Sequence, residues 1–254
     1  MSDTLKERIA RGDVLLGTWM KTPSMMIAEV LSYTPFDLVC LDAEHAPFDR
    51  RDLDQCLGVL SLRQMPALVR VPSRASEHTL NALDLGASGV VIPHVTDVDT
   101  AKNIVKQSQF QAGGRGFAGS TRAANYTAKG MAQHLQDSAA QTVVLAQIED
   151  VDGVENIEAI AAVDGIDCLF IGRADLTVAL GAASPAAPEV VAAVERVCRA
   201  GRDFGRPTGM FLSDLRELPH WRELGATVFI LSSDHGCMLA GAKKLATEFN
   251  ELAG

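Results

Sequence analysis

Paired cysteines and long apolar runs are missing from this sequence. Its five cysteines are odd in number and widely scattered, and no two of them form a CxxC pair. Neither a disulfide framework nor a zinc knuckle is therefore indicated, and we expect reduced, mostly buried thiols. No apolar run approaches the roughly 20 residues needed to span a bilayer, and the charged, amphipathic start MSDTLKERIARGD is unlike a secretory signal. These absences predict a cytoplasmic protein that does not insert into a membrane.

Aromatic residues and an excess of positive charge are also lacking. Only 5% of the 254 residues are aromatic whereas 47% are hydrophobic, so the core must consist mainly of Ala, Val, Leu and Ile. Such a composition is common where helices pack on a parallel sheet. The formal net charge of −9 offers no broad basic surface to a phosphate backbone, which argues against a nucleic-acid partner. An anionic substrate would need local help from an arginine or a metal ion.

The chain does contain a regular alternation of strand-like and helix-like segments. Most intervals between apolar runs hold apolar residues at helical spacing, for example Leu53, Leu57 and Leu60. Eight such units in about 250 residues predict one (β/α)8 TIM barrel, a single domain over residues 1–254. A doubly wound open sheet is the alternative, because strand order cannot be read from one sequence. The eight predicted strands are residues 14–20, 36–42, 66–72, 88–95, 142–149, 167–172, 207–213 and 226–233.

The predicted strand ends are unusually polar, and a barrel of this kind assembles its active site from the carboxyl ends of its strands. Glu149 and Asp175 come from adjacent strand ends and could converge on one hard cation. The alternative is that each acid caps the helix that follows it. Gln147 lies two residues before Glu149 and projects to the same side, which favours a shared site. Two carboxylates without a cysteine or histidine cluster indicate Mg or Mn, with Co, Ni or Zn as further candidates.

Arg70 and His45 also lie at strand ends. A guanidinium inside an apolar strand pattern needs an anionic partner. This partner could be a barrel acid, Asp42 or Asp84, or else a substrate carboxylate or a developing oxyanion. The aliphatic layers inside TIM barrels favour the second. His45 follows two acids and is a candidate base that Asp42 could orient. The other histidines at strand ends, ranked second, are His94 and His235.

Lysine is absent between Lys129 and Lys243, a segment that covers predicted strands five to eight. A Schiff-base aldolase needs a lysine that projects into the barrel, so imine chemistry on the sixth strand is excluded. Lys21, just after the first strand, is the only lysine near a strand end. No Walker A motif and no GxGxxG after a strand supports a nucleotide cofactor. The Gly-, Ser- and Thr-rich residues 111–130 form the one long predicted loop, and loops of this length in compact domains more often have a function than serve only as connections.

Six motifs together resemble the class II pyruvate aldolases of the HpcH/HpaI family, which includes 4-hydroxy-2-oxoheptanedioate and 2-dehydro-3-deoxyglucarate aldolases. The motifs are LDAEHAPFD, VRVP, LDLGASGVVIPHV, GGRGFAGSTRAANY, AQIED and FIGRADL, at the second, third and fourth strands, the long loop, and the fifth and sixth strands. The resemblance covers nearly the whole chain. It implies a metal-dependent (β/α)8 barrel whose last helix is exchanged between neighbouring subunits, assembled as a hexamer from dimers.

The resemblance also implies roles for individual residues. The implied metal ligands are Glu149 and Asp175. The implied catalytic group consists of His45 as the base, Arg70 as the enolate stabiliser, Asp42 as the partner of His45, and Asp84 as a support for the basicity of the active-site histidine. The implied contacts with the 2-oxoacid come from Gln147, the backbone at Ala174, Arg70, and the strand-end residues Gly172, Leu212 and Ser213.

The implied reaction is reversible cleavage of a 4-hydroxy-2-oxoacid to pyruvate, or a related 2-oxoacid, and an aldehyde through an enolate that the metal stabilises. The alternatives are a citrate- or malyl-CoA-type lyase on the same scaffold and a non-catalytic relative that binds an oxoacid or a metal. The chain departs from the family at Arg173, where a proline is usual. This cation would either extend recognition to an anionic aldehyde or a different 2-oxoacid, or form a surface ion pair. Glu44 has no assigned role.

Overall fold

The structure is a computed structural model that describes residues 3–253. Eight parallel strands close into a barrel in chain order, because β1 pairs with both β2 and β8. The predicted (β/α)8 barrel is confirmed, and the open-sheet alternative is wrong. The strands are β1 (Leu15–Met20), β2 (Leu38–Asp42), β3 (Ala67–Arg70), β4 (Gly89–Ile92), β5 (Val143–Ile148), β6 (Cys168–Ile171), β7 (Thr208–Leu212) and β8 (Ala226–Ser233).

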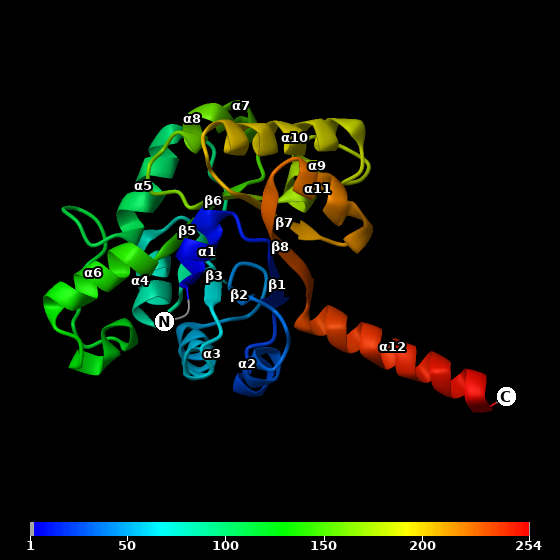
Figure 1. Ribbon diagram of the computed structural model, residues 1–254, viewed down its shortest axis with the longest axis horizontal. Coiled ribbons are helices and arrows are strands. Elements are labelled where there is room, and N and C mark those ends of the chain that lie inside the picture. Colours follow the sequence, from blue (N-terminus) through cyan, green and yellow to red (C-terminus); the bar gives the residue numbers. More distant parts are fainter. Residues whose placement is uncertain (1–2, 254) are drawn as a thin grey trace.

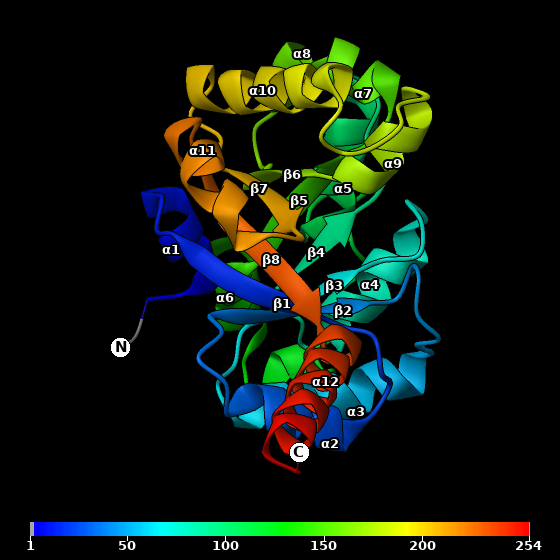
Figure 2. The same cartoon turned by 90° about the vertical axis from the view of Figure 1, so that its right-hand side faces the viewer.

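Helices connect the strands and surround the barrel (Figures 1 and 2). Within the described residues, none of them is both long enough and apolar enough to cross a membrane. The helices are α1 (Leu5–Arg11), α2 (Met25–Ser32), α3 (Arg50–Leu62), α4 (Ser76–Asp84), α5 (Val98–Ser108), η1 (Arg122–Thr127), α6 (Met131–Gln141), α7 (Val151–Glu155), α8 (Ile157–Ala161), α9 (Arg173–Ala179), α10 (Pro188–Asp203), η2 (Leu215–Glu217), α11 (Leu218–Glu223) and α12 (Asp234–Ala253).

Strand β2 illustrates why continuous apolar runs form this fold. Leu38 and Cys40 belong to the cluster inside the barrel, whereas Val39 and Leu41 belong to the cluster between the barrel and the helices. Successive side chains of a strand point to opposite faces, and here both faces are covered. Every residue of β2 is therefore buried, which removes the apolar and polar alternation of a half-exposed strand.

Helix α1 packs against the amino-terminal end of the barrel interior. Its Leu5 and Ile9 are buried in the same cluster as the inward-facing strand residues. The helix begins with a capping box, in which Thr4 and Glu7 each accept a hydrogen bond from the other's backbone N–H. Toward the opposite end, Trp19 and Phe170 meet edge to face with 6.1 Å between their ring centroids. These two rings form the floor of the cavity described below.

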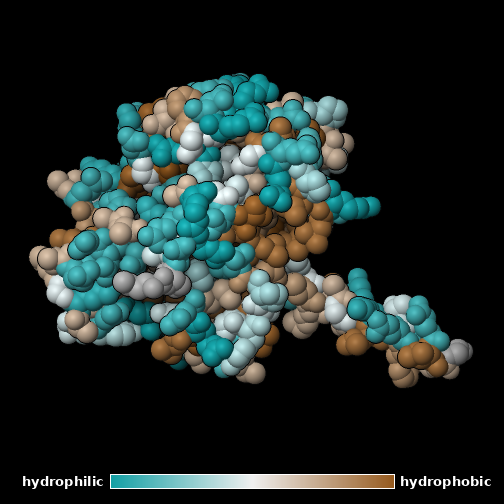
Figure 3. Space-filling model, viewed as in Figure 1, coloured by the Kyte–Doolittle hydropathy of each residue, from teal (hydrophilic) through white to brown (hydrophobic). Residues whose placement is uncertain are grey.

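Helix α12 projects away from the barrel, so its apolar side chains find no cover within the described chain (Figure 1). Leu245, Phe249 and Leu252 are 68%, 70% and 90% exposed. Figure 3 shows apolar atoms on the far part of this helix, well separated from the body of the molecule. A helix that exposes this much apolar surface lacks a packing partner.

Candidate active site

A cavity of about 450 Å³ opens at the carboxyl-terminal ends of the strands, where TIM barrels carry their active sites. It brings together residues from the ends of seven strands, all except β4, and from the segments that follow them. Among the predicted site residues, those lining it are His45, Arg70, Gln147, Gly172, Ala174 and Asp175. Further lining residues that sequence reasoning did not assign to a site include Trp19, Lys21, Phe170, Phe211, Ser232 and Ser233.

Asp42 is the fully buried acid at one side of this cavity. Its Oδ1 accepts a hydrogen bond from Nε of Arg70 at 2.9 Å and lies 2.8 Å from Nη2 of the same guanidinium in an ion pair, and its Oδ2 lies 2.6 Å from Nζ of Lys21. Burial acts to raise the pKa of Asp42, but these two cations outweigh it and hold that pKa below its usual range. Asp42 therefore remains ionised, and the alternative that the sequence favoured less, an ion pair of Arg70 with a barrel acid, is present.

The expected contact of Asp42 with the imidazole of His45 is not what the structure shows. Asp42 Oδ1 accepts a hydrogen bond from the backbone N–H of His45 at 3.2 Å. Asp42 therefore stabilises the turn after β2 and does not orient the imidazole ring of His45. The carboxylate near the ring is that of Glu44, whose Oε2 lies 3.6 Å from His45 Nε2 and 3.4 Å from Arg70 Nε. Burial raises the pKa of Glu44. Glu44, left without a role by the sequence, is thus the acid placed to orient His45.

Glu149 lies at the end of β5 with only 2% of its surface exposed. Its Oε2 accepts from the side-chain amide of Gln147, and its Oε1 accepts from the backbone N–H of His94 at 2.9 Å. The predicted pairing of Gln147 and Glu149 on one side of the strand is present. The capping alternative for Glu149 is not supported, because within the described residues its carboxylate accepts hydrogen bonds from β5 and from the loop after β4 rather than from α7.

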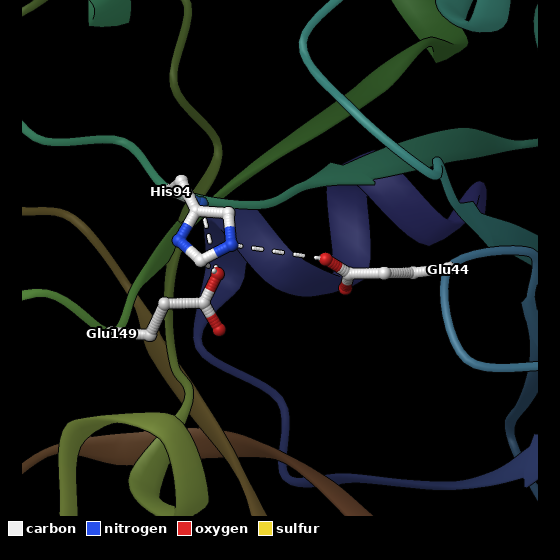
Figure 4. A group of neighbouring side chains, drawn as sticks. All are labelled: Glu44, His94 and Glu149. Carbon is white, nitrogen blue, oxygen red and sulfur yellow. Dashed lines mark hydrogen bonds and ion pairs between the residues drawn. The ribbon is translucent and has the colours of Figure 1, made fainter. Parts of the chain in front are cut away.

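His94 is the site residue that sequence reasoning undervalued. Its imidazole lies between Glu44 and Glu149, and one donor atom from each of the three lies within 4.8 Å of the others (Figure 4). Its Nδ1 is also 2.9 Å from Oδ2 of Asp150. The backbone of His94 has φ +55°, a left-handed conformation that is uncommon for a residue other than glycine and often marks a functional site. Its position after β4 was the only signal in the sequence.

The residues around Glu149 fit a divalent cation. Burial raises the pKa of Glu149, which means that the carboxylate has too little positive charge nearby. Oε1 of Gln147 and Oε2 of Glu44 are buried and receive no hydrogen bond within the described residues. A Cβ at Gly172 would lie 2.6 Å from Oε2 of Glu149, so glycine keeps space open beside this oxygen. Carboxylate and amide oxygens are the donors that hard cations prefer.

Three predicted residues lie elsewhere than expected. Asp84 ends α4, where the charged groups that act on it are Arg115, Arg50 and His134 rather than His45. Leu212 is fully buried in the cluster between barrel and helices, so its side chain faces away from the cavity, and Phe211 occupies the wall instead. Ser213 is exposed beyond the end of β7 and is not part of the cavity lining. Neither Leu212 nor Ser213 contributes a side chain to this cavity.

Arg173 is buried and forms an ion pair with a partly exposed acid. Its guanidinium pairs with Glu217, which also accepts from Trp221 Nε1 at 3.1 Å, and it lies 5.1 Å from the Trp221 ring centroid. Only 8% of Arg173 is exposed. The side chain therefore joins the start of α9 to α11.

A closed (β/α)8 barrel with this set of polar groups at its carboxyl end defines an enzyme of the TIM-barrel type. Residues 15–240 match the family model described as HpcH/HpaI aldolase/citrate lyase, and the chain belongs to this family. The predicted family and the prediction of a lyase of the aldolase type are thereby confirmed.

The relatives share nearly their full length with this chain. It is 32% identical to a hydroxypyruvate/pyruvate aldolase of Paraburkholderia phytofirmans, over 97% of both proteins. It is also 32% identical to a 5-keto-4-deoxy-D-glucarate aldolase of Shigella boydii, over 97% of this chain and 96% of that protein. The crystal structure of an HpcH/HpaI aldolase/citrate lyase family protein from Burkholderia cenocepacia superposes with a TM-score of 0.90 at 34% identity, covering 97% of this chain and 98% of that one.

Proposed function

We propose that this chain is a single-domain, divalent-metal-dependent aldolase that reversibly cleaves 4-hydroxy-2-oxoacids to pyruvate, or a related 2-oxoacid, and an aldehyde. The observation that carries the proposal is one cavity lined by an exposed imidazole, His45, and a buried guanidinium, Arg70. The under-compensated carboxylate of Glu149 lies directly behind the Gln147 and Gly172 side of this cavity. These are the groups that formation of an enolate from a 2-oxoacid requires: a cation site, a base and an oxyanion partner.

In this proposal Glu149 and Asp175 hold the cation, which is Mg or Mn by preference. When bound, a divalent cation supplies Lewis-acid polarisation of the carbonyl group. Gln147 contributes its unpaired Oε1 to the same region, and Gly172 and the backbone at Ala174 leave room for the carboxylate of a small 2-oxoacid. A second possible set of metal ligands consists of Glu44, His94 and Glu149. Both ligand sets therefore include the carboxylate of Glu149.

His45 removes the proton from the methyl group of the 2-oxoacid in the direction of addition. Its side chain is 53% exposed and lines the cavity, so a substrate can reach its imidazole. Glu44, 3.6 Å from Nε2, stabilises the imidazolium that results. Arg70 is 8% exposed and held by Asp42, which fixes its guanidinium near the position where the enolate oxygen develops its charge. In the cleavage direction the same groups return the proton to the enolate.

A pyruvate-release assay over a panel of 4-hydroxy-2-oxoacids, with and without added Mg or Mn, tests the proposed function. We expect pyruvate from at least one member of the panel, and a strong increase on addition of either metal to metal-depleted protein. Absence of pyruvate from every member with both metals present would contradict the proposal.

We also propose that α12 packs against a second copy of this chain in a homo-oligomer, with a hexamer as the expected assembly. Its exposed Leu245 and Phe249 would be covered there. The double variant Leu245→Asp and Phe249→Asp should therefore lower the molar mass measured by light scattering, because each carboxylate would have to be buried at the contact. Asn250→Asp, which adds an acid to the same helix without removing an apolar side chain, should keep the mass of the unaltered protein. Equal masses for all three proteins would count against the role of α12.

A further inference from the structure

Lys21 lies at the mouth of the cavity in a position that its backbone contacts fix. It follows β1 directly, and its backbone N–H donates to Oδ1 of Asp234 at 2.9 Å. The next residue, Thr22, donates its N–H to Oδ2 of the same carboxylate, also at 2.9 Å. Asp234 begins α12 and is only 6% exposed. The base of the Lys21 side chain is therefore held between β1 and the end of β8.

The ammonium group of Lys21 reaches both a buried acid and the cavity. Its Nζ lies 2.6 Å from Oδ2 of Asp42, whereas 29% of the side chain remains exposed and lines the cavity. An ammonium has three N–H donors, and the described residues pair this one with a single acid. Donors therefore remain for a ligand in the cavity.

The two oxygens of Asp42 have different partners. Oδ1 accepts hydrogen bonds from Nε of Arg70 and from the backbone N–H of His45 and forms an ion pair with Nη2 of Arg70, whereas Oδ2 forms its ion pair with Nζ of Lys21. One N–H donor of the Lys21 ammonium serves Oδ2 of Asp42, so this buried contact leaves its other two donors for a ligand.

The position of Lys21 across the barrel indicates which substrate it meets. In the closed order of eight strands, β1 lies four strands from β5, whose end carries Glu149. A 2-oxoacid held at the β5 and β6 side leaves the opposite part of the same cavity for the second substrate. That part is lined by Trp19, Lys21, Ser232 and Ser233, so Lys21 supplies its charge.

We propose that Lys21 determines specificity for the aldehyde: its ammonium group binds an anionic substituent, such as a carboxylate, on the aldehyde that adds to the 2-oxoacid. This inference rests on the proposed function and names the class of its second substrate. A carboxylate there would accept charge-assisted hydrogen bonds from Lys21 in a partly desolvated cavity. A neutral aldehyde of the same size would gain nothing from the charge.

The test compares addition of pyruvate to glyoxylate, which is anionic, and to glycolaldehyde, which is neutral and of similar size. The selectivity is the ratio of the two kcat/KM values. We expect Lys21→Met to lower this ratio by about 10- to 100-fold, as loss of one charge-assisted contact would. Lys21→Arg should restore most of the ratio, because it restores the charge. Lys102→Met, which removes an exposed lysine from α5, is the matched control and should leave the ratio unchanged.

An unchanged ratio in Lys21→Met would overturn the inference, as would equal losses for both aldehydes. If Lys21→Met does not fold, Lys21→Gln gives the same comparison, and a neutral side chain that keeps the glyoxylate preference would overturn the inference equally. Failure of the proposed function looks different: the unaltered protein would then neither add pyruvate to either aldehyde nor exchange the methyl protons of pyruvate for deuterium.

Discussion

The Glu149→Gln variant should lose pyruvate release by at least about a thousandfold, together with its stimulation by Mg or Mn. The substitution keeps the size of the side chain and an oxygen for the backbone N–H of His94, but it removes the negative charge that attracts the cation. Lewis-acid activation contributes several kcal/mol to reactions of this kind, which corresponds to a loss of about three orders of magnitude. The measurement is the initial rate of pyruvate release as a function of metal concentration, combined with metal binding by equilibrium dialysis.

Glu155→Gln provides the matched control for this experiment. Glu155 is an exposed acid at the end of α7, six residues further along the chain, and its neutralisation should change neither rate nor metal affinity. Treatment of the unaltered protein with EDTA should reproduce the loss, and added Mg or Mn should reverse it. A Glu149→Gln protein that folds and still responds to metal as before would show that the cation lies elsewhere.

The His45→Ala variant should slow exchange of the methyl protons of pyruvate in deuterated water by about 100- to 10,000-fold, the usual contribution of a general base. The imidazole is exposed to the cavity, and Glu44 at 3.6 Å from Nε2 favours the protonated product of the transfer. NMR follows the exchange directly without an aldehyde, so the proton transfer is measured separately from bond formation. His78→Ala, in α4, is the control and should retain full exchange.

A His94→Ala variant in the same experiment distinguishes between the two imidazoles that could act as the base. His94 is the other imidazole beside Glu44, at 4.0 Å from Oε1, but it also contacts the proposed metal ligand Glu149. If His94→Ala abolished exchange while His45→Ala left it intact, the base would be His94 and the assignment of His45 would be wrong. We expect His94→Ala to act mainly through metal affinity, which the same dialysis measurement detects.

Most strand-end residues could be found from the sequence because the rule that places them is local. A continuous apolar run followed by a polar residue marks a strand end, and parallel strands of a barrel bring all such ends together. Arg70, Gln147 and Asp175 were located in this way, and the structure places all three at one cavity. The sequence is less informative about which of two adjacent strand residues lines the cavity. A shift of the strand register by one residue would exchange the faces to which Phe211 and Leu212 point. Because both residues are apolar, the sequence does not reveal which of them faces the cavity.

Partner choice could not be read from the sequence. Asp42 lies three residues from His45 in the chain, but its carboxylate pairs with Arg70 and Lys21, which arrive from β3 and β1. Asp84 was assigned to a histidine at the active site, yet within one chain it faces Arg115 and His134. In each case the opposite charges come from segments far away in the chain, and sequence distance does not measure separation in space.

The sequence by itself determined the eight strands, the barrel class, the family and the polar character of the cavity, because hydrophobic periodicity and short motifs carry this information locally. Only the tertiary structure decided that Glu44 and His94 join Glu149, that Lys21 faces the cavity from the side opposite the proposed metal ligands, and that Arg173 is tied to Glu217. Barrel closure, strand register and side-chain direction set these contacts, and each depends on residues far apart in the chain.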